Sequence, residues 1–335
     1  MRYIGVLSLA PGKGKRKYRR IFFATDLHGS ELVFRKFISV AKFYDVDALI
    51  MGGDVFGKSF VPLIMDDSGK YSFEVHGQKL SQVPESDIPK YELQFMNAGE
   101  YPQRISKSEY EELLADEAKV SAFFDRLMSE RLIRWAALGT ENLAPLGVKC
   151  YWTGGNDDKQ ENIDKVVSTD YFVNVDGKVA RIDDEHELAS LGWSNPTPWK
   201  TPRECNEEEL ASKLDQLTSK IAEPSSCIFN IHPPPYDSNL DTAAKLDASF
   251  DPPRPVTSGG QQVLIPVGST SVRAAIEKTQ PLLMLCGHIH ETKNDSKIKR
   301  TLCINPGSEY NAGLLRGVIV NVEKNKVLSH QFTSG

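Results

Sequence analysis

Aspartate, asparagine and histidine residues recur at five places in the chain, and each place directly follows a short apolar, strand-like run. The five clusters are Asp26-Leu27-His28, Gly53-Asp54, Gly155-Asn156, His232 and Gly287-His288-Ile289-His290. Carboxylate oxygen and imidazole nitrogen without thiolate suit Mn, Fe or Zn, and they differ from the ligands of a structural zinc site. The pattern therefore predicts a metal centre.

Two of these clusters separate their ligand-type side chains by one residue. In extended chain the side chains of residues i and i+2 point to the same side, so each pair can reach one metal cluster. Asp54 offers two carboxylate oxygens and can bridge two ions. Two ions about 3.5–4 Å apart can orient a bridging hydroxide for in-line attack on phosphorus and stabilise charge on the leaving oxygen.

Each motif alone also has a purely structural interpretation. An aspartate after a strand often caps a helix, Gly-Asp is a common turn, and a histidine before proline is often a loop residue. However, four of the seven histidines fall at strand ends, in the order DxH, GD, GN, H, GHxH. Two imidazoles in GHxH are hard to explain by packing. We interpret the other three histidines, His76, His186 and His330, as surface or core residues.

The elements that must position these clusters alternate between strands and helices. Ligands of α/β sheets bind beyond the strand ends, so clusters from residue 26 to residue 290 can converge in space. The 335 residues are 40% hydrophobic, which is enough for a substantial core. We predict strands over 21–25, 48–51, 148–153, 171–175, 178–182, 227–231, 281–286, 301–304 and 317–322, and helices over 31–43, 207–221 and 271–278.

The alternation of strand-like and helical segments is interrupted between residues 57 and 147. Within this segment, 71–75 is predicted as a hairpin strand, and Ser106 or Ser108 as the cap of one long helix reaching about Trp135. We interpret 57–147 as an insertion or cap that shapes the substrate pocket of a single domain, 1–335; a purely structural subdomain is the alternative. The long segment 233–268, rich in Pro, Ser, Gly and Asp, is predicted as a functional or flexible loop.

The composition limits the kinds of partner. A net charge of −5 gives no broad electrostatic reason to bind nucleic acid or an anionic membrane, so an anionic partner, such as the small phosphate ester that the metal centre would act on, must be attracted locally. The five cysteines show no CxxC pair, which indicates reduced thiols. Residues 3–10 are apolar and precede a basic run, the reverse of a secretory signal, and we expect a cytoplasmic protein of unknown oligomeric state.

The ordered motifs resemble the signature of the calcineurin-like metallophosphoesterase family, and Asn305-Pro306-Gly307-Ser308 resembles a turn frequent in that family. The resemblance implies a four-layer α/β/β/α sandwich of mixed sheets that hydrolyses a phosphate mono- or diester through a metal-bridging hydroxide. It also implies two divalent ions. The first would be bound by Asp26, His28 and His290, the second by Asn156, His232 and His288, and Asp54 would bridge them.

One position departs from the family pattern. Many members have GNH followed by an acid, and that histidine protonates the leaving group or contacts phosphate, whereas here Asp157 follows Asn156. We therefore place Asp157 beside Asp54 as a candidate catalytic residue, with Lys159, Arg254 and Arg273 as candidates for phosphate contact. Two alternatives stay open: a non-catalytic scaffold with this fold, and a phosphoprotein phosphatase.

Overall fold

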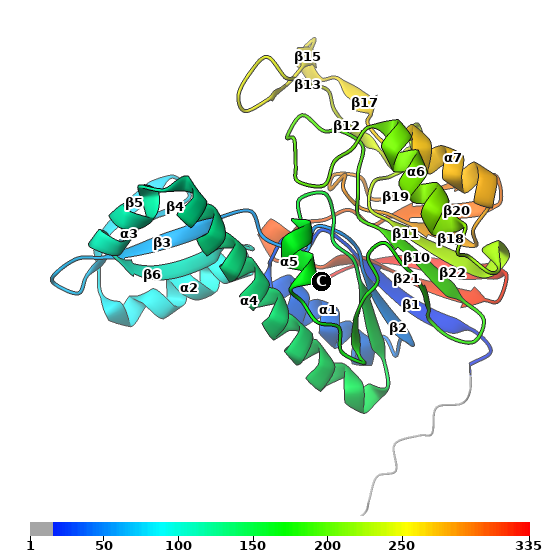
Figure 1. The fold of residues 1–335 in the computed structure, drawn as a ribbon, viewed down its shortest axis with the longest axis horizontal. Coiled ribbons are helices and arrows are strands. Elements are labelled where there is room, and N and C mark those ends of the chain that lie inside the picture. Colours follow the sequence, from blue (N-terminus) through cyan, green and yellow to red (C-terminus); the bar gives the residue numbers. More distant parts are fainter. Residues whose placement is uncertain (1–15) are drawn as a thin grey trace, which may run out of the picture.

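The computed structural model describes residues 16–335, so the apolar segment 3–10 lies outside the described residues. Two six-stranded sheets form the body of the molecule (Figure 1). The first has the order β22-β21-β1-β2-β7-β8, the second β19-β20-β18-β11-β10-β9. Their bounds are β1 Arg19–Ala24, β2 Ala48–Met51, β7 Lys149–Trp152, β8 Phe172–Asn174, β21 Arg316–Glu323, β22 Lys326–Ser334, β9 Val179–Arg181, β10 Glu187–Leu191, β11 Cys227–Ile231, β18 Leu283–Leu285, β19 Asn294–Ile298 and β20 Thr301–Asn305.

The central strands pair in parallel, and antiparallel strands lie at one edge of the first sheet and at both edges of the second, so both sheets are mixed. Strand β1 shows why its residues form a central strand. Phe23 points into the apolar layer between the two sheets, while Phe22 points into the layer beneath the helices. Because successive side chains alternate between faces, a strand that is apolar at both positions is buried on both sides.

Helices cover the outer face of each sheet. On the first sheet lie α1 (Glu31–Phe43) and α4 (Glu117–Leu143), and on the second lie α6 (Glu207–Thr218) and α7 (Thr270–Thr279) (Figure 1). Helix α1 begins where the Ser30 side chain accepts a hydrogen bond from the backbone N–H of Val33. The four layers confirm the predicted α/β/β/α sandwich.

The segment after Asp54 builds a separate small sheet beside the sandwich (Figure 1). Its order is β5-β4-β3-β6, with β3 Phe60–Met65, β4 Tyr71–Val75, β5 Gln78–Val83 and β6 Tyr101–Ser106. Helix α2 (Ile88–Asn97) closes one face of the sheet over its own apolar core. Helix α3 (Lys107–Leu114) follows β6 and contacts β3 and β6.

The prediction of one long helix after Ser106 or Ser108 is wrong, because the chain forms two helices there. Ser106 and Glu109 form a capping box that starts α3. The Asp116 side chain then accepts hydrogen bonds from Ala118 and Lys119 in extended geometry and starts α4. An aspartate at this place favours a new N-terminus over a continuous helix.

The small sheet is fixed against the sandwich by a buried arginine of α4. Arg131 donates hydrogen bonds to the carbonyl oxygens of Gly29 at 2.7 Å and Glu100 at 2.8 Å, and its guanidinium lies 3.8 Å from the ring centre of Tyr101. At Gly57 a Cβ atom would come 1.9 Å from the carbonyl oxygen of Gly99. Backbone therefore packs on backbone at this junction, which holds the small sheet in a defined position.

The segment 233–268, predicted as a loop, contains paired short strands. β12 (Thr242–Ala244) pairs with β17 (Leu264–Pro266), β13 (Leu246–Asp247) with β14 (Arg254–Pro255), and β15 (Thr257–Ser258) with β16 (Gln261–Gln262). Among residues 16–335, no helix combines the length and the apolar character that crossing a membrane requires.

Opposite charges tie the two sheets together around His186. Its Nδ1 lies 3.0 Å from Asp183 Oδ1, its Nε2 lies 3.2 Å from the carbonyl oxygen of Glu323 in β21, and Arg19 of β1 pairs with Asp183 at 3.1 Å. Burial lowers the pKa of His186, but Asp183 outweighs burial and leaves that pKa raised. The pKa of Asp183 is lowered to about 2, because its hydrogen bonds to His186 and Glu185 outweigh burial.

This pair predicts a pH-dependent contribution to stability. A histidine whose folded-state pKa is raised stabilises the fold below its unfolded pKa of about 6.5, and the contribution is lost as pH rises through the folded pKa. We expect His186→Gln to lower the free energy of unfolding, measured by urea denaturation, more at pH 5.5 than at pH 8.5. The exposed His76→Gln serves as control. An equal loss at both pH values contradicts this prediction.

Candidate metal centre

All seven predicted ligand residues lie just beyond the carboxyl ends of central strands. Asp26 and His28 follow β1, and Asp54 and Asn156 follow the neighbouring strands β2 and β7. From the other sheet, His232 follows β11, and the pair His288 and His290 follows the adjacent strand β18. The two sheets therefore bring these side chains to one edge of the sandwich.

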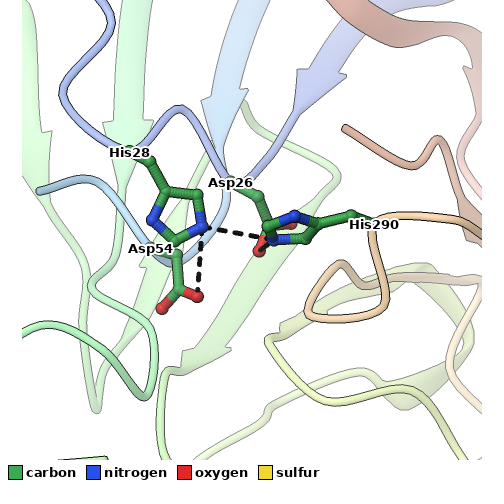
Figure 2. Close-up of side chains that lie close together, drawn as sticks. All are labelled: Asp26, His28, Asp54 and His290. Carbon is green, nitrogen blue, oxygen red and sulfur yellow. Dashed lines mark hydrogen bonds and ion pairs between the residues drawn. The ribbon is translucent and has the colours of Figure 1, made fainter. Parts of the chain in front are cut away.

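Asp26, His28, Asp54 and His290 form a first cluster, with ligand atoms all within 4.8 Å of one another (Figure 2). The Nε2 atoms of His28 and His290 lie 3.2 Å apart, and His290 Nε2 lies 3.3 Å from Asp26 Oδ1. His28 Nε2 lies 3.6 Å from Asp54 Oδ2. The cluster offers two imidazole nitrogens and two carboxylates around one point.

Asn156, His232 and His288 meet the other side of Asp54 and form a second cluster. The Oδ1 atom of Asn156 lies 2.9 Å from His232 Nε2 and 2.7 Å from His288 Nδ1. His232 Nε2 lies 3.4 Å from Asp54 Oδ1. Asp54 thus turns one carboxylate oxygen to each cluster, as a bridging ligand must.

The donor atoms fit divalent ions. Two atoms about 2.1 Å from one ion, at angles of about 90–110°, are themselves about 3.0–3.4 Å apart. The distances within the two clusters, from 2.7 Å between His288 Nδ1 and Asn156 Oδ1 to 3.6 Å between His28 Nε2 and Asp54 Oδ2, lie around these values. The arrangement can hold two ions that share Asp54.

The electrostatics of the clusters also suit cations. Burial lowers the pKa of His28 to about 3 and that of His288 to about 4, which keeps both imidazoles neutral and able to bind metal. Burial also lowers the pKa of His232, but the Asp54 carboxylate outweighs it and raises that pKa to about 9. The carboxylates that favour a proton on His232 equally favour a divalent cation between these residues.

Four of the ligand residues have backbone in the left-handed region, with φ of 55° at Asp26, 42° at His28, 56° at Asp54 and 68° at His288. Residues other than glycine rarely adopt this conformation, and strain of this kind, about 1–3 kcal/mol for each residue, collects at functional sites. These turns aim the side chains inward immediately after their strands end. The chain therefore gives up some stability to bring the ligands together.

Hydrogen bonds behind the ligands hold their loops in place. The Asp158 carboxylate accepts from the backbone N–H groups of Val55 and Phe56, both at 2.9 Å, and from that of Gly155 at 2.7 Å. It thereby joins the loop after Asp54 to the loop that carries Asn156. Asn305 donates to the carbonyl oxygens of Gly287 and Ile289, and the Ser308 hydroxyl donates to that of Asp26 at 2.7 Å.

Asp157, the second predicted catalytic residue, lies at the rim of the first cluster. Its backbone N–H donates to Asp54 Oδ1 at 3.0 Å, and its Oδ2 lies 3.9 Å from His28 Nδ1 and 2.6 Å from the Nζ atom of Lys58. Burial and the Asp54 charge raise the pKa of Asp157 to about 6. Burial lowers the pKa of Lys58, but Asp157 outweighs it and the pKa is raised.

Sequence reasoning missed Lys58, whose side chain is 53% exposed beside the cluster. The predicted phosphate contacts make other interactions. Lys159 pairs with Asp125 at 2.9 Å, Arg273 with Glu277 at 3.1 Å, and the Arg254 guanidinium lies 4.7 Å from the Phe250 ring centre. A lysine in the stretch after Gly-Asp, Val55-Phe56-Gly57-Lys58, was the one available signal.

Comparison by sequence gives a match over part of the chain. No family model matches the chain. An uncharacterised protein of Methanocaldococcus jannaschii is 34% identical over 155 residues, which are 45% of this chain and 61% of that protein. This chain thus spans about three fifths of the relative that it matches.

One solved crystal structure is similar at a TM-score of 0.56 and 13% identity, over 94% of this chain and 98% of that chain. A dimetal phosphatase from Danio rerio has a TM-score of 0.41 at 7% identity, over 94% of this chain and 98% of that one. The first likeness shows that the two chains share a fold over almost their whole lengths. The four-layer arrangement of the chain is the one that the resemblance to the calcineurin-like metallophosphoesterases implies.

Proposed function

We propose that the chain is a metal-dependent phosphoesterase that hydrolyses a phosphate mono- or diester. The observation that carries the proposal is the pair of ligand clusters sharing Asp54. Asp26, His28 and His290 would hold one ion with Asp54, and Asn156, His232 and His288 the other. When bound, two divalent ions supply a nucleophile from water at neutral pH and stabilise the charge on the transferring phosphoryl group.

Lys58 supplies the positive charge that the substrate needs outside the clusters. Its ammonium group can donate hydrogen bonds to a phosphate oxygen, and such charge-assisted bonds are about twice as strong as neutral ones. Asp157 holds Lys58 in place at 2.6 Å. The family histidine is thus replaced by an ion pair, which also offsets the repulsion between the Asp157 carboxylate and phosphate.

The scaffold alternative is less well supported, because a protein that has lost catalysis is expected to lose ligands. All seven candidate ligands are present, and each lies within 4.0 Å of another. No feature of the described residues favours a phosphopeptide over another ester. We therefore retain the general activity and test the kind of ester directly.

Removal of metal tests the proposal. Protein stripped with a chelator should not hydrolyse p-nitrophenyl phosphate or bis(p-nitrophenyl) phosphate, and Mn²⁺, Fe²⁺ or Zn²⁺ should restore turnover, followed as nitrophenolate release. The ratio of the two rates would assign mono- or diesterase activity. Protein with two bound ions and no turnover of any phosphate ester would support the scaffold alternative and refute the proposal.

A further inference from the structure

A groove of about 1490 Å³ runs from the metal centre across the small inserted sheet. His28, Lys58 and Tyr310 line its inner part, and Ile64 and Leu114 of the insertion also line it. Pockets that bury a drug-sized ligand occupy about 300–1,000 Å³. The groove is therefore much larger than a phosphate group with a small ester requires.

The floor of the groove is an incompletely covered face of the inserted sheet. Val61 and Leu63 of β3 point into the core beneath α2. Because side chains alternate along a strand, Phe60, Pro62 and Ile64 point to the opposite face, and all three line the groove. Phe60 packs against Phe123 and Phe124 of α4, with ring centres 5.5 and 6.3 Å apart, which closes this face at the end nearer the sandwich.

Toward the far end, apolar side chains are left in solvent. Leu114 is 52% exposed and Ile64 is half-buried, and both line the groove. Contiguous exposed apolar surface commonly marks a binding site. The junction at Arg131 and Gly57 fixes the inserted sheet relative to His28, so the groove and the metal centre keep one arrangement.

The charges that line the groove do not favour a polyanion. Three lysines, Lys58, Lys79 and Lys107, are balanced by the acidic side chains Asp66, Glu74, Glu100 and Glu111. A nucleic acid is bound largely by neutralising its phosphates, which needs an excess of basic groups. Lys58 alone lies beside the clusters, where a single phosphate would sit.

We propose that this groove binds the organic part of the substrate, and that the substrate is a phosphate ester with an extended, largely apolar organic group. The inference rests on the proposed phosphoesterase activity. Lys58 and the metal centre bind the phosphate, while Pro62, Ile64 and Leu114 contact the organic group. This proposal can be tested with diester substrates that share one leaving group and differ only in the second ester group.

The experiment compares methyl and octyl p-nitrophenyl phosphate, below the critical micelle concentration, with the metal-loaded protein. Each buried methylene contributes about 0.8 kcal/mol, or about fourfold, so contact with two or three of them gives the octyl ester an advantage of about tenfold or more in kcat/KM. Leu114→Glu should reduce this advantage, the ratio of the two kcat/KM values, severalfold. Val167→Glu, at a residue 81% exposed outside the groove, is the matched control.

A binding measurement separates the groove from the chemistry. Octyl phosphate should bind the metal-loaded protein about tenfold more tightly than methyl phosphate by calorimetry, and Leu114→Glu should remove most of the difference. Equal binding of the two, or equal turnover of the two esters, overturns the groove proposal while phosphoesterase activity stands. If octyl phosphate binds tightly but no ester is hydrolysed, the proposed function fails and the binding groove remains.

Discussion

Asp54→Asn is expected to lower kcat by about a thousandfold or more and to reduce the metal content of the protein from two ions per chain to one or fewer. The aspartate has an oxygen facing each cluster, at 3.6 Å from His28 Nε2 and 3.4 Å from His232 Nε2. An amide offers one oxygen and no negative charge. The expected fall in kcat corresponds to losing several kcal/mol of the stabilisation that the metal ions give the transition state, since each 1.36 kcal/mol lost lowers the rate tenfold.

Elemental analysis and nitrophenyl ester kinetics on the same preparations measure this effect. Asp170→Asn makes the same chemical change at an exposed residue outside both clusters, and it should leave metal content and rate unchanged. Thermal unfolding of the variants shows whether each is folded. An Asp54→Asn protein that keeps two ions and near-normal turnover is incompatible with a bridging role.

Lys58→Met is expected to lower kcat/KM for p-nitrophenyl phosphate by about a hundredfold while the protein still binds two ions. A hydrogen bond to a charged group contributes about 1.5–3 kcal/mol, which is roughly ten- to 150-fold. Loss of Lys58 also removes the cation that lies 2.6 Å from Asp157, so no positive charge balances that acidic residue beside the phosphate. Lys58→Arg keeps the charge and should recover part of the activity.

The location of the lysine makes this prediction specific. Lys107→Met removes the same charge from α3, a helix of the inserted sheet, and should change kcat/KM less than about threefold, the range for an exposed charge. Asp157→Asn should raise KM more than it lowers kcat, because it frees Lys58 without removing it. Equal rates for Lys58→Met and wild type would show that Lys58 does not bind substrate, and loss of metal from Lys58→Met would contradict the prediction that it acts outside the metal clusters.

The convergence of the ligands could be predicted from the residues because it depends on local rules, whereas the four-layer sandwich was implied by the resemblance to a known family. The doubly apolar strands β1, β2 and β11 are readable from residues such as Phe22 and Phe23, and the polar residue directly after each strand is readable with them. Where parallel strands end at one edge, residues far apart in the chain must meet. The left-handed turns at Asp26 and Asp54 follow from that need but leave no mark in residue type.

The inserted sheet and Lys58 could not be predicted in the same way. The edge strand β5 (Gln78–Val83) is mostly polar, and the strand β6 contains Pro102, so neither shows an apolar run. The break between α3 and α4 depends on a second cap, at Asp116, which forms in addition to the capping box at Ser106. Lys58 gains its role only because Asp157, from a distant loop, lies 2.6 Å away. Long-range contacts of this kind have no local signal.

The central claim is that two metal ions share Asp54, and an anomalous difference map from crystals grown with Mn²⁺ tests it most directly. We predict two peaks about 3.5–4 Å apart. One should lie within coordination distance of Asp26, His28 and His290, the other of Asn156, His232 and His288, with Asp54 touching both. A single peak, or peaks away from these side chains, would contradict a dinuclear centre.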